Sequence, residues 1–266
     1  MTVLLTILIG ALVGAHASTW GMYKDAPHEG FTSGKYLRSI VLSAGIAPLV
    51  AWIFRISPTT AAAGVILFGC IYSMERAILE TWKTFFRQED QSKYTIPMQL
   101  AVFGKTVFTR RARVLYGILY LAVIFGGLAL LSSYRPAPGM SALFLAVTIG
   151  ALGGWYSAIG GAWKDAPIEG FEILKFFRSP LMAAFFSYLL FRLGATPAQG
   201  VFGAIGYSVA TTETYKTFFF PSKPRGKFAN KPVLFPDWLE KRQRFVPLYG
   251  AVWVVVITGF VVALIR

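Results

Sequence analysis

Long apolar segments separated by shorter polar ones run along the whole chain. The apolar segments lie at 2–23, 40–54, 60–79, 114–131, 141–163, 180–191, 196–212 and 245–265. A helix needs roughly 17–20 residues to cross about 30 Å of hydrocarbon, and most of these segments are that long. The pattern predicts an all-α integral membrane protein with eight transmembrane helices.

One polar motif, KDAPxEGF, occurs twice, at Lys24–Phe31 and again at Lys164–Phe171. Between Trp20 and Ser39, 11 of 20 positions are identical to the residues found 140 positions later. A second repeated segment begins at Glu80 and recurs from Glu213, and the repeated segments keep their order. Self-similarity of this kind indicates a duplicated structural unit.

The duplication predicts how the chain is organised. Residues 1–133 form a first repeat of four helices, 134–140 form a turn, and 141–266 form a second repeat of four helices. Because four crossings return the chain to its starting side, both copies have the same orientation. We therefore expect a 4+4 arrangement with a pseudo-two-fold axis along the membrane normal.

The distribution of basic residues gives an orientation. If every apolar segment crosses the membrane, only Arg55, Arg135, Arg192 and Arg266 of the 26 Lys and Arg fall on one side. Basic loops face the cytoplasm in plasma and inner membranes. We therefore predict that both termini are outside and that the two repeated motifs are cytoplasmic.

Composition agrees with a membrane protein and narrows its chemistry. The chain is 55% hydrophobic, has a mean hydropathy of +0.57 and carries a formal net charge of +14. Basic loops beside anionic lipid headgroups account for this charge, so the expected partners are the bilayer and its headgroups and not a nucleic acid. With one cysteine and two histidines, a zinc or haem site is not expected, and we expect no cofactor. Walker, GxSxG and HExxH motifs are absent from the sequence, which argues against an ATP-driven pump acting alone.

The repeated motif has two interpretations. Asp25 and Asp165 each stand two residues before a proline, so either aspartate is suited to cap an interfacial helix, in the first copy from Ala26 to about Leu37. The alternative is a functional site, because ionisable groups at membrane depth are functional candidates by default. A cap alone does not explain why the accompanying lysines, arginine and glutamate are also repeated.

The second apolar segment of each copy is short. Residues 40–54 and 180–191 occupy equivalent positions and contain Pro48 and Pro180. Paired short or broken spans mark the binding site in many transporters. Thinning of the bilayer, or a tilted neighbouring helix, is the alternative explanation.

Other polar residues have structural explanations. Glu80 and Glu213 each precede a lysine by three residues, which favours an ion pair on one helix face. We expect His16 to bond to a neighbouring helix. We expect a short interfacial helix near Met98–Phe108.

Small residues four apart also repeat in the first span of each copy. Gly10 and Gly14 match Gly150 and Gly154, which predicts close helix packing, with the two first spans meeting at the axis.

These patterns favour a channel or secondary transporter for an anionic or phosphate-bearing solute or lipid headgroup. The alternatives are a membrane enzyme acting at the cytoplasmic face on a lipid-linked phosphate, with Mg²⁺ on Asp25 and Glu29, and a membrane assembly or scaffold protein. The oligomeric state is left open. The candidate substrate-binding residues are Lys24, Asp25, Glu29, Lys35, Arg38, Glu80, Lys164, Asp165, Glu169, Lys175, Arg178 and Glu213.

Overall fold

The computed structural model describes residues 2–102, 105–220 and 227–265, apart from the side chains of 163–165 and 175. The fold is almost entirely helical. Its long helices are α1 (Thr2–Glu29), α2 (Ser33–Phe54), α3 (Ala61–Thr81), α4 (Arg110–Ser133), α6 (Ala151–Glu169), α7 (Ile173–Arg192), α8 (Pro197–Phe218) and α10 (Val246–Ile265). Two single-turn helices, α5 (Ala142–Leu145) and α9 (Trp238–Lys241), lead into α6 and α10 through short π and 3₁₀ segments. A π-helical turn, Trp82–Phe86, extends α3.

Within these described residues, six helical segments are long and apolar enough to cross a membrane. They are Thr2–Glu29, Ser33–Phe54, Ala61–Phe86, Arg110–Ser133, Ala142–Ala162 and Trp238–Ile265. The all-α, multi-pass character expected from the apolar pattern therefore fits the structure.

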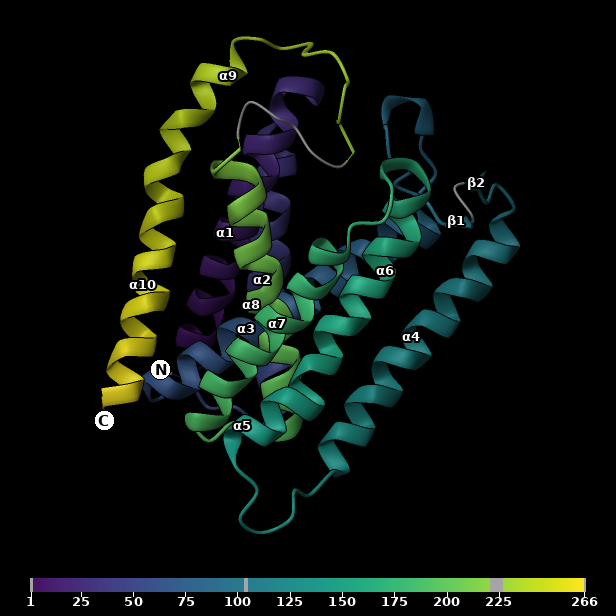
Figure 1. Ribbon diagram of the computed structural model, residues 1–266. Coiled ribbons are helices and arrows are strands. Elements are labelled where there is room, and N and C mark those ends of the chain that lie inside the picture. The colour runs from purple at the N-terminus through teal and green to yellow at the C-terminus, as the bar shows by residue number, and fades with distance from the viewer. Residues whose placement is uncertain (1, 103–104, 221–226, 266) are drawn as a thin grey trace.

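The ends of the helices fall into two groups (Figure 1). The N-terminus, the C-terminus and the 134–140 turn lie at one end of the molecule, at the bottom of the view. Helix α9 and the strands β1 (Ala101–Val102) and β2 (Lys105–Thr106) lie toward the opposite end. The polar connections of both halves therefore gather at a single end, which we call the polar end.

The expected interfacial helix at Met98–Phe108 is wrong. A two-stranded antiparallel pair occupies this segment, with Ala101 opposite Thr106. An isolated helix of this length is marginal, and the segment finds other backbone partners. The Leu100 N–H donates to Thr84 O at 2.9 Å, and the Val107 N–H donates to Leu100 O at 2.8 Å.

The expected helix cap at Asp25 is also wrong. Helix α1 runs through Asp25 and Pro27 without a break and ends at Glu29. Gly30 follows with φ +74°, a conformation that favours glycine and commonly ends a helix. Helix α2 then begins after Thr32, whose hydroxyl accepts the Lys35 N–H at 3.3 Å. The glycine of the motif, and not its aspartate, sets this helix boundary.

The second spans are not short. The apolar segments at 40–54 and 180–191 continue helices that begin earlier, so α2 has 22 residues and α7 has 20. Each contains its proline without a break in the helix. The expectation of paired broken spans is wrong, because each helix begins several residues before its apolar segment, and charged residues such as Arg38 in α2 and Arg178 in α7 interrupt the apolar pattern.

The repeated glycines do pack closely, but against a different partner from the one expected. A Cβ atom added to Gly14 would lie 2.4 Å from Ser39 O on α2. A Cβ atom on Gly154 would likewise lie 2.4 Å from Ser179 O on α7. Each first helix therefore packs against the second helix of its own half.

Helices α3 and α8 cross at the centre, in the place where we expected the first spans to meet. A Cβ atom on Gly206 would lie 2.1 Å from Gly69 O, so the two backbones nearly touch. The crossing is surrounded by buried side chains that include Leu67, Tyr72 and Tyr207. It forms the middle of the hydrophobic core and joins the two halves.

Candidate functional site

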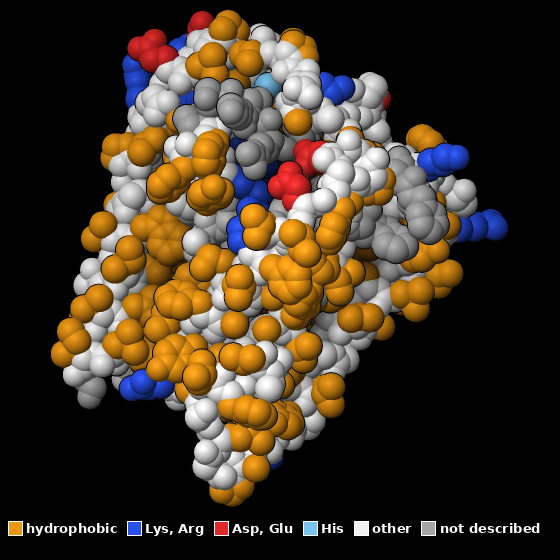
Figure 2. Space-filling model, in the orientation of Figure 1, with side chains coloured by type: hydrophobic (Ala, Val, Ile, Leu, Met, Phe, Trp, Pro, Cys, Tyr) orange, Lys and Arg blue, Asp and Glu red, His pale blue; other side chains and the backbone are white. Residues whose placement is uncertain are grey.

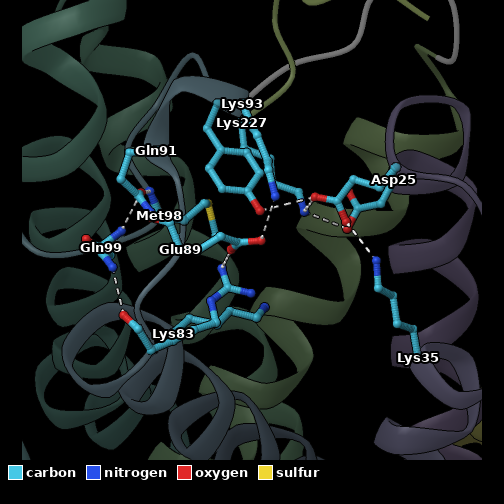
Figure 3. A network of polar contacts seen from close by, with 12 residues as sticks. Asp25, Lys35, Lys83, Glu89, Gln91, Lys93, Met98, Gln99 and Lys227 are labelled. Carbon is cyan, nitrogen blue, oxygen red and sulfur yellow. Dashed lines mark hydrogen bonds and ion pairs between the residues drawn. The ribbon is translucent and has the colours of Figure 1, made fainter. Parts of the chain in front are cut away.

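The first copy of the motif holds a lysine from the far end of the chain (Figure 3). Lys227 Nζ lies 2.8 Å from Asp25 Oδ2 and 3.5 Å from Glu29 Oε1. Lys35 Nζ lies 3.6 Å from Glu29 Oε2. The Tyr94 hydroxyl donates to Glu29 Oε1 at 3.2 Å. The two motif carboxylates therefore bind a primary ammonium group inside a small polar cluster.

Aromatic rings complete the surroundings of this ammonium group. Lys227 Nζ lies 4.6 Å from the centroid of the Phe228 ring and 5.4 Å from that of Tyr94, within range of cation–π attraction. Burial alone lowers the pKa of Lys227, but Asp25 and Glu29 outweigh it and raise this pKa above its ordinary value. Burial, followed by the charge of Glu29, raises the pKa of Tyr94, which therefore stays protonated as a donor.

The segment that carries Lys227 covers the end of α1. The N–H groups of Leu234 and Phe235 donate to Pro27 O at 3.0 and 2.9 Å. His28 Nδ1 lies 2.9 Å from Pro232 O. We call residues 227–235 the covering segment. Its contacts enclose the first copy of the motif.

The first polar loop supports the covering segment from the other side. The Thr95 N–H donates to Lys227 O at 2.8 Å, and Lys231 Nζ donates to Ser92 O at 2.7 Å. Within this loop, the Gln91 side chain accepts the N–H groups of Met98 and Gln99 at 2.8 and 3.1 Å. These bonds hold the loop in the position shown in Figure 3.

Lys227→Met should loosen the covering segment. The substitution leaves Asp25 and Glu29 without their shared cation, which costs roughly 1–3 kcal/mol for partly buried charged hydrogen bonds. Limited proteolysis in detergent should cut the covering segment several times faster than in the wild type. Lys241→Met, which removes an exposed pair with Asp237, is the matched control.

The same contact has a defined pH dependence. Because the pKa of Lys227 is raised, its stabilising effect is complete below the ordinary lysine pKa of about 10.4. The effect is lost only as the pH rises through the raised value. Protection that already declines between pH 6 and 9 would contradict a role for this ion pair.

One predicted site residue of the first copy contacts the second half. Lys24 Nζ lies 3.8 Å from Glu213 Oε2 on α8, and Lys216 Nζ lies 3.6 Å from Glu213 Oε1. The corresponding pair on α3 joins Lys83 Nζ to Glu80 Oε1 at 3.2 Å. The ion pairs expected within each helix are therefore confirmed, and Lys24 adds a link between the two halves.

The second copy of the motif borders a cavity of about 150 Å³ between α6, α7 and α8. Its charged lining residues are Glu172, Arg178, Glu213 and Lys216. Hydroxyl groups line it as well, from Ser157, Ser179, Ser208 and Thr212. In Figure 2, basic and acidic side chains lie beside one another in the upper middle of the visible face, above a broad apolar area. The cavity can offer both hydrogen-bond donors and acceptors to a polar ligand.

The remaining predicted residues are placed as follows. Arg38 is exposed on α2 and forms no ion pair with the residues that the structure describes. Glu169 is exposed at the end of α6. The side chains of Lys164, Asp165 and Lys175 lie outside the described residues. The structure thus brings together Asp25, Glu29 and Lys35, and it joins Lys24 to Glu213. Arg178 and Glu213 both line the same cavity.

The two copies differ at buried residues near the motif. In the first copy Glu75 is fully buried and paired with Arg76, whose guanidinium lies 5.3 Å from the Trp20 ring centroid. The sequence offset aligns Ser208 and Val209 with this pair, and both line the cavity. The side chains at these two positions are therefore smaller in the second copy, where the cavity lies.

His16 behaves as expected from the sequence. It is buried, and its Nδ1 lies 3.0 Å from the Tyr72 hydroxyl on the neighbouring helix α3. Trp20 Nε1 donates to the same hydroxyl at 2.8 Å. These bonds join α1 to α3.

Sequence reasoning missed Lys227, Tyr94 and the hydroxyl lining of the cavity. Lys227 is one of several cations in a basic loop, and its contacts join residues 198 and 202 positions apart. The small residues aligned with Glu75 and Arg76 were the available signal for the cavity. No family model, curated protein or solved structure matches this chain.

Proposed function

We propose that this protein is a secondary transporter for an anionic, phosphate-bearing solute or lipid headgroup. The observation that carries the proposal is the cavity at the polar end of the second half, whose lining combines Arg178 and Lys216 with several hydroxyl groups. A guanidinium group matches phosphate oxygens in pairs, and an ammonium group adds a positive charge. Of the residues predicted from the sequence, Arg178 and Glu213 line this cavity.

The cavity is suited to a headgroup and too small for a whole large ligand. Pockets that enclose drug-sized molecules measure roughly 300–1,000 Å³, whereas this one measures about 150 Å³. A phosphate group with a short substituent would fill it. The remainder of a larger substrate would lie outside, along the surface of α6 and α7.

We further propose eight spans, as a 4+4 repeat of residues 1–133 and 141–266 joined by the 134–140 turn. The equivalent contacts of Gly14 and Gly154 support this arrangement. So do the ring contacts of His16 with Trp253 at 5.2 Å and of Tyr156 with Tyr120 at 6.0 Å, which join aligned positions. The grouping of both termini at one end supports a plasma or inner membrane protein with its termini outside and the polar end cytoplasmic.

A carrier fits these contacts better than the other candidates. A pore between the repeats would occupy the centre, where α3 and α8 cross in backbone contact. The enzyme alternative needs Asp25 and Glu29 to hold Mg²⁺, but both carboxylates already bind Lys227. A scaffold has no use for charged residues around a cavity.

Arg178→Gln should reduce transport by about tenfold or more, because an interaction with phosphate worth 1.4 kcal/mol changes affinity tenfold. The assay measures uptake of radiolabelled inorganic phosphate and translocation of a fluorescent acidic phospholipid in proteoliposomes. Arg192→Gln changes an exposed arginine outside the cavity lining and is the matched control. Equal activity of both variants and the wild type would contradict the proposed site.

A further inference from the structure

The first copy of the motif shows what its carboxylates recognise. Asp25 and Glu29 hold the primary ammonium of Lys227, and the ring of Phe228 lies against the same group. Lys227 is attached to the chain through the covering segment, so it acts as a ligand that the protein itself supplies. The first copy is therefore a filled ammonium site.

The cavity of the second copy carries charges of both signs. Its lining contains two basic residues, Arg178 and Lys216, and two acidic residues, Glu172 and Glu213. Glu213 already pairs with Lys24 and Lys216, whereas Glu172 forms no ion pair with any residue that the structure describes. The negative charge of Glu172 would repel a purely anionic ligand.

Glu172 also marks a difference between the copies. Its counterpart is Thr32, whose hydroxyl caps α2 by accepting the Lys35 N–H. Glu172 stands at the same position before α7 but accepts no capping bond through its side chain. Its carboxylate is therefore not used by the helix and remains at the edge of the cavity.

We infer that this cavity binds a zwitterionic aminoalkyl phosphate, with the phosphate toward Arg178 and Lys216 and a primary ammonium toward Glu172. The inference rests on the proposed anion site and names its substrate class. The ammonium binds a carboxylate as Lys227 does in the first copy, but this carboxylate aligns with Thr32 and not with Asp25 or Glu29. A primary ammonium is favoured over a quaternary one because it donates hydrogen bonds to carboxylates.

Apolar side chains beside the cavity leave room for an attached lipid chain. Phe171, Ile173 and Leu174 are 61%, 62% and 84% exposed at the junction of α6 and α7. The headgroup of an amine-bearing phospholipid and a free aminoalkyl phosphate share the chemistry required here. The experiment distinguishes these two sources.

The test measures binding to full-length protein in nanodiscs made of phosphatidylcholine. O-phosphoethanolamine should bind about tenfold tighter than inorganic phosphate or phosphocholine, the size expected for one added charge-assisted hydrogen bond. Glu172→Gln should abolish this preference while inorganic phosphate binds as before or tighter. Arg178→Gln should weaken both ligands. Glu240→Gln, at an exposed carboxylate on α9, should match the wild type.

The outcomes separate the inference from the proposed function. If inorganic phosphate binds, but O-phosphoethanolamine binds no tighter, the inference is wrong and the anion site stands. If neither ligand binds, both proposals fail. Competition by vesicles containing phosphatidylethanolamine, but not by pure phosphatidylcholine vesicles, identifies a lipid headgroup as the ligand. If O-phosphoethanolamine binds and vesicles containing phosphatidylethanolamine do not compete with it, the ligand is a soluble aminoalkyl phosphate.

Discussion

Gly206→Ala is expected to separate α3 from α8. The added methyl group would lie 2.1 Å from Gly69 O and 3.0 Å from Ser73 N, which are backbone atoms that cannot rotate away. The helices must move apart, and overpacking of a close-packed core costs about 1–3 kcal/mol or more. Because this crossing joins the two halves, the whole fold should be destabilised.

The one cysteine of the chain reports this change directly. Cys70 is fully buried, and its Sγ lies 3.7 Å from Gln199 O on α8. A maleimide should label it slowly in the wild type and much faster in Gly206→Ala. Gly45→Ala is the control, because no atom lies within 4 Å of its added methyl and alanine favours a helix by about 1 kcal/mol. Equal labelling rates in the two variants would contradict the packing argument.

Arg76→Met is expected to destabilise the protein by about 3–5 kcal/mol, the usual cost of removing one partner of a buried ion pair. Glu75 is fully buried and has Arg76 as its ion-pair partner. Without this cation the carboxylate would remain in the core uncompensated. Trp20 would also lose the guanidinium that lies over its ring.

A second substitution tests this explanation. Glu75→Gln combined with Arg76→Met removes both charges and should restore much of the lost stability, as measured by thermal unfolding and Cys70 labelling. Lys93→Met, which removes an exposed lysine from its pair with Glu89, should change stability by no more than about 1 kcal/mol. If the double variant is no more stable than Arg76→Met alone, an unpaired buried carboxylate is not the cause.

The apolar and polar patterns of the sequence predicted the positions of the long helices but not all of their ends. The apolar segments located the long helices because burial in lipid or protein requires such residues over many turns. Helix starts were missed at Ser33 and Ile173, because charged residues such as Arg38 and Arg178 separate these starts from the apolar segments. The boundary after Glu29 depends on the backbone of Gly30, which neither charge nor hydropathy reveals.

The candidate site was predictable as a set of residues but not as an arrangement. Repetition of the motif identified Asp25 and Glu29 without indicating that Lys227 would bind them. Their contact joins segments that are adjacent only in the folded chain. The cavity depends on small side chains in the second copy, such as that of Ser208. The sequence reveals such a position only when it is aligned with the larger Glu75 of the first copy.

The covering segment and Arg242 contact helix α1 from positions about 200 residues later in the chain. Arg242 donates to Tyr23 O at 2.8 Å across 219 positions, and His28 reaches Pro232 O across 204. Contacts between such distant positions form late, since the intervening chain must be present first. Helices α1 to α4 are therefore synthesised with Asp25 and Glu29 uncovered, and these two carboxylates gain their shared cation only after Lys227 has left the ribosome.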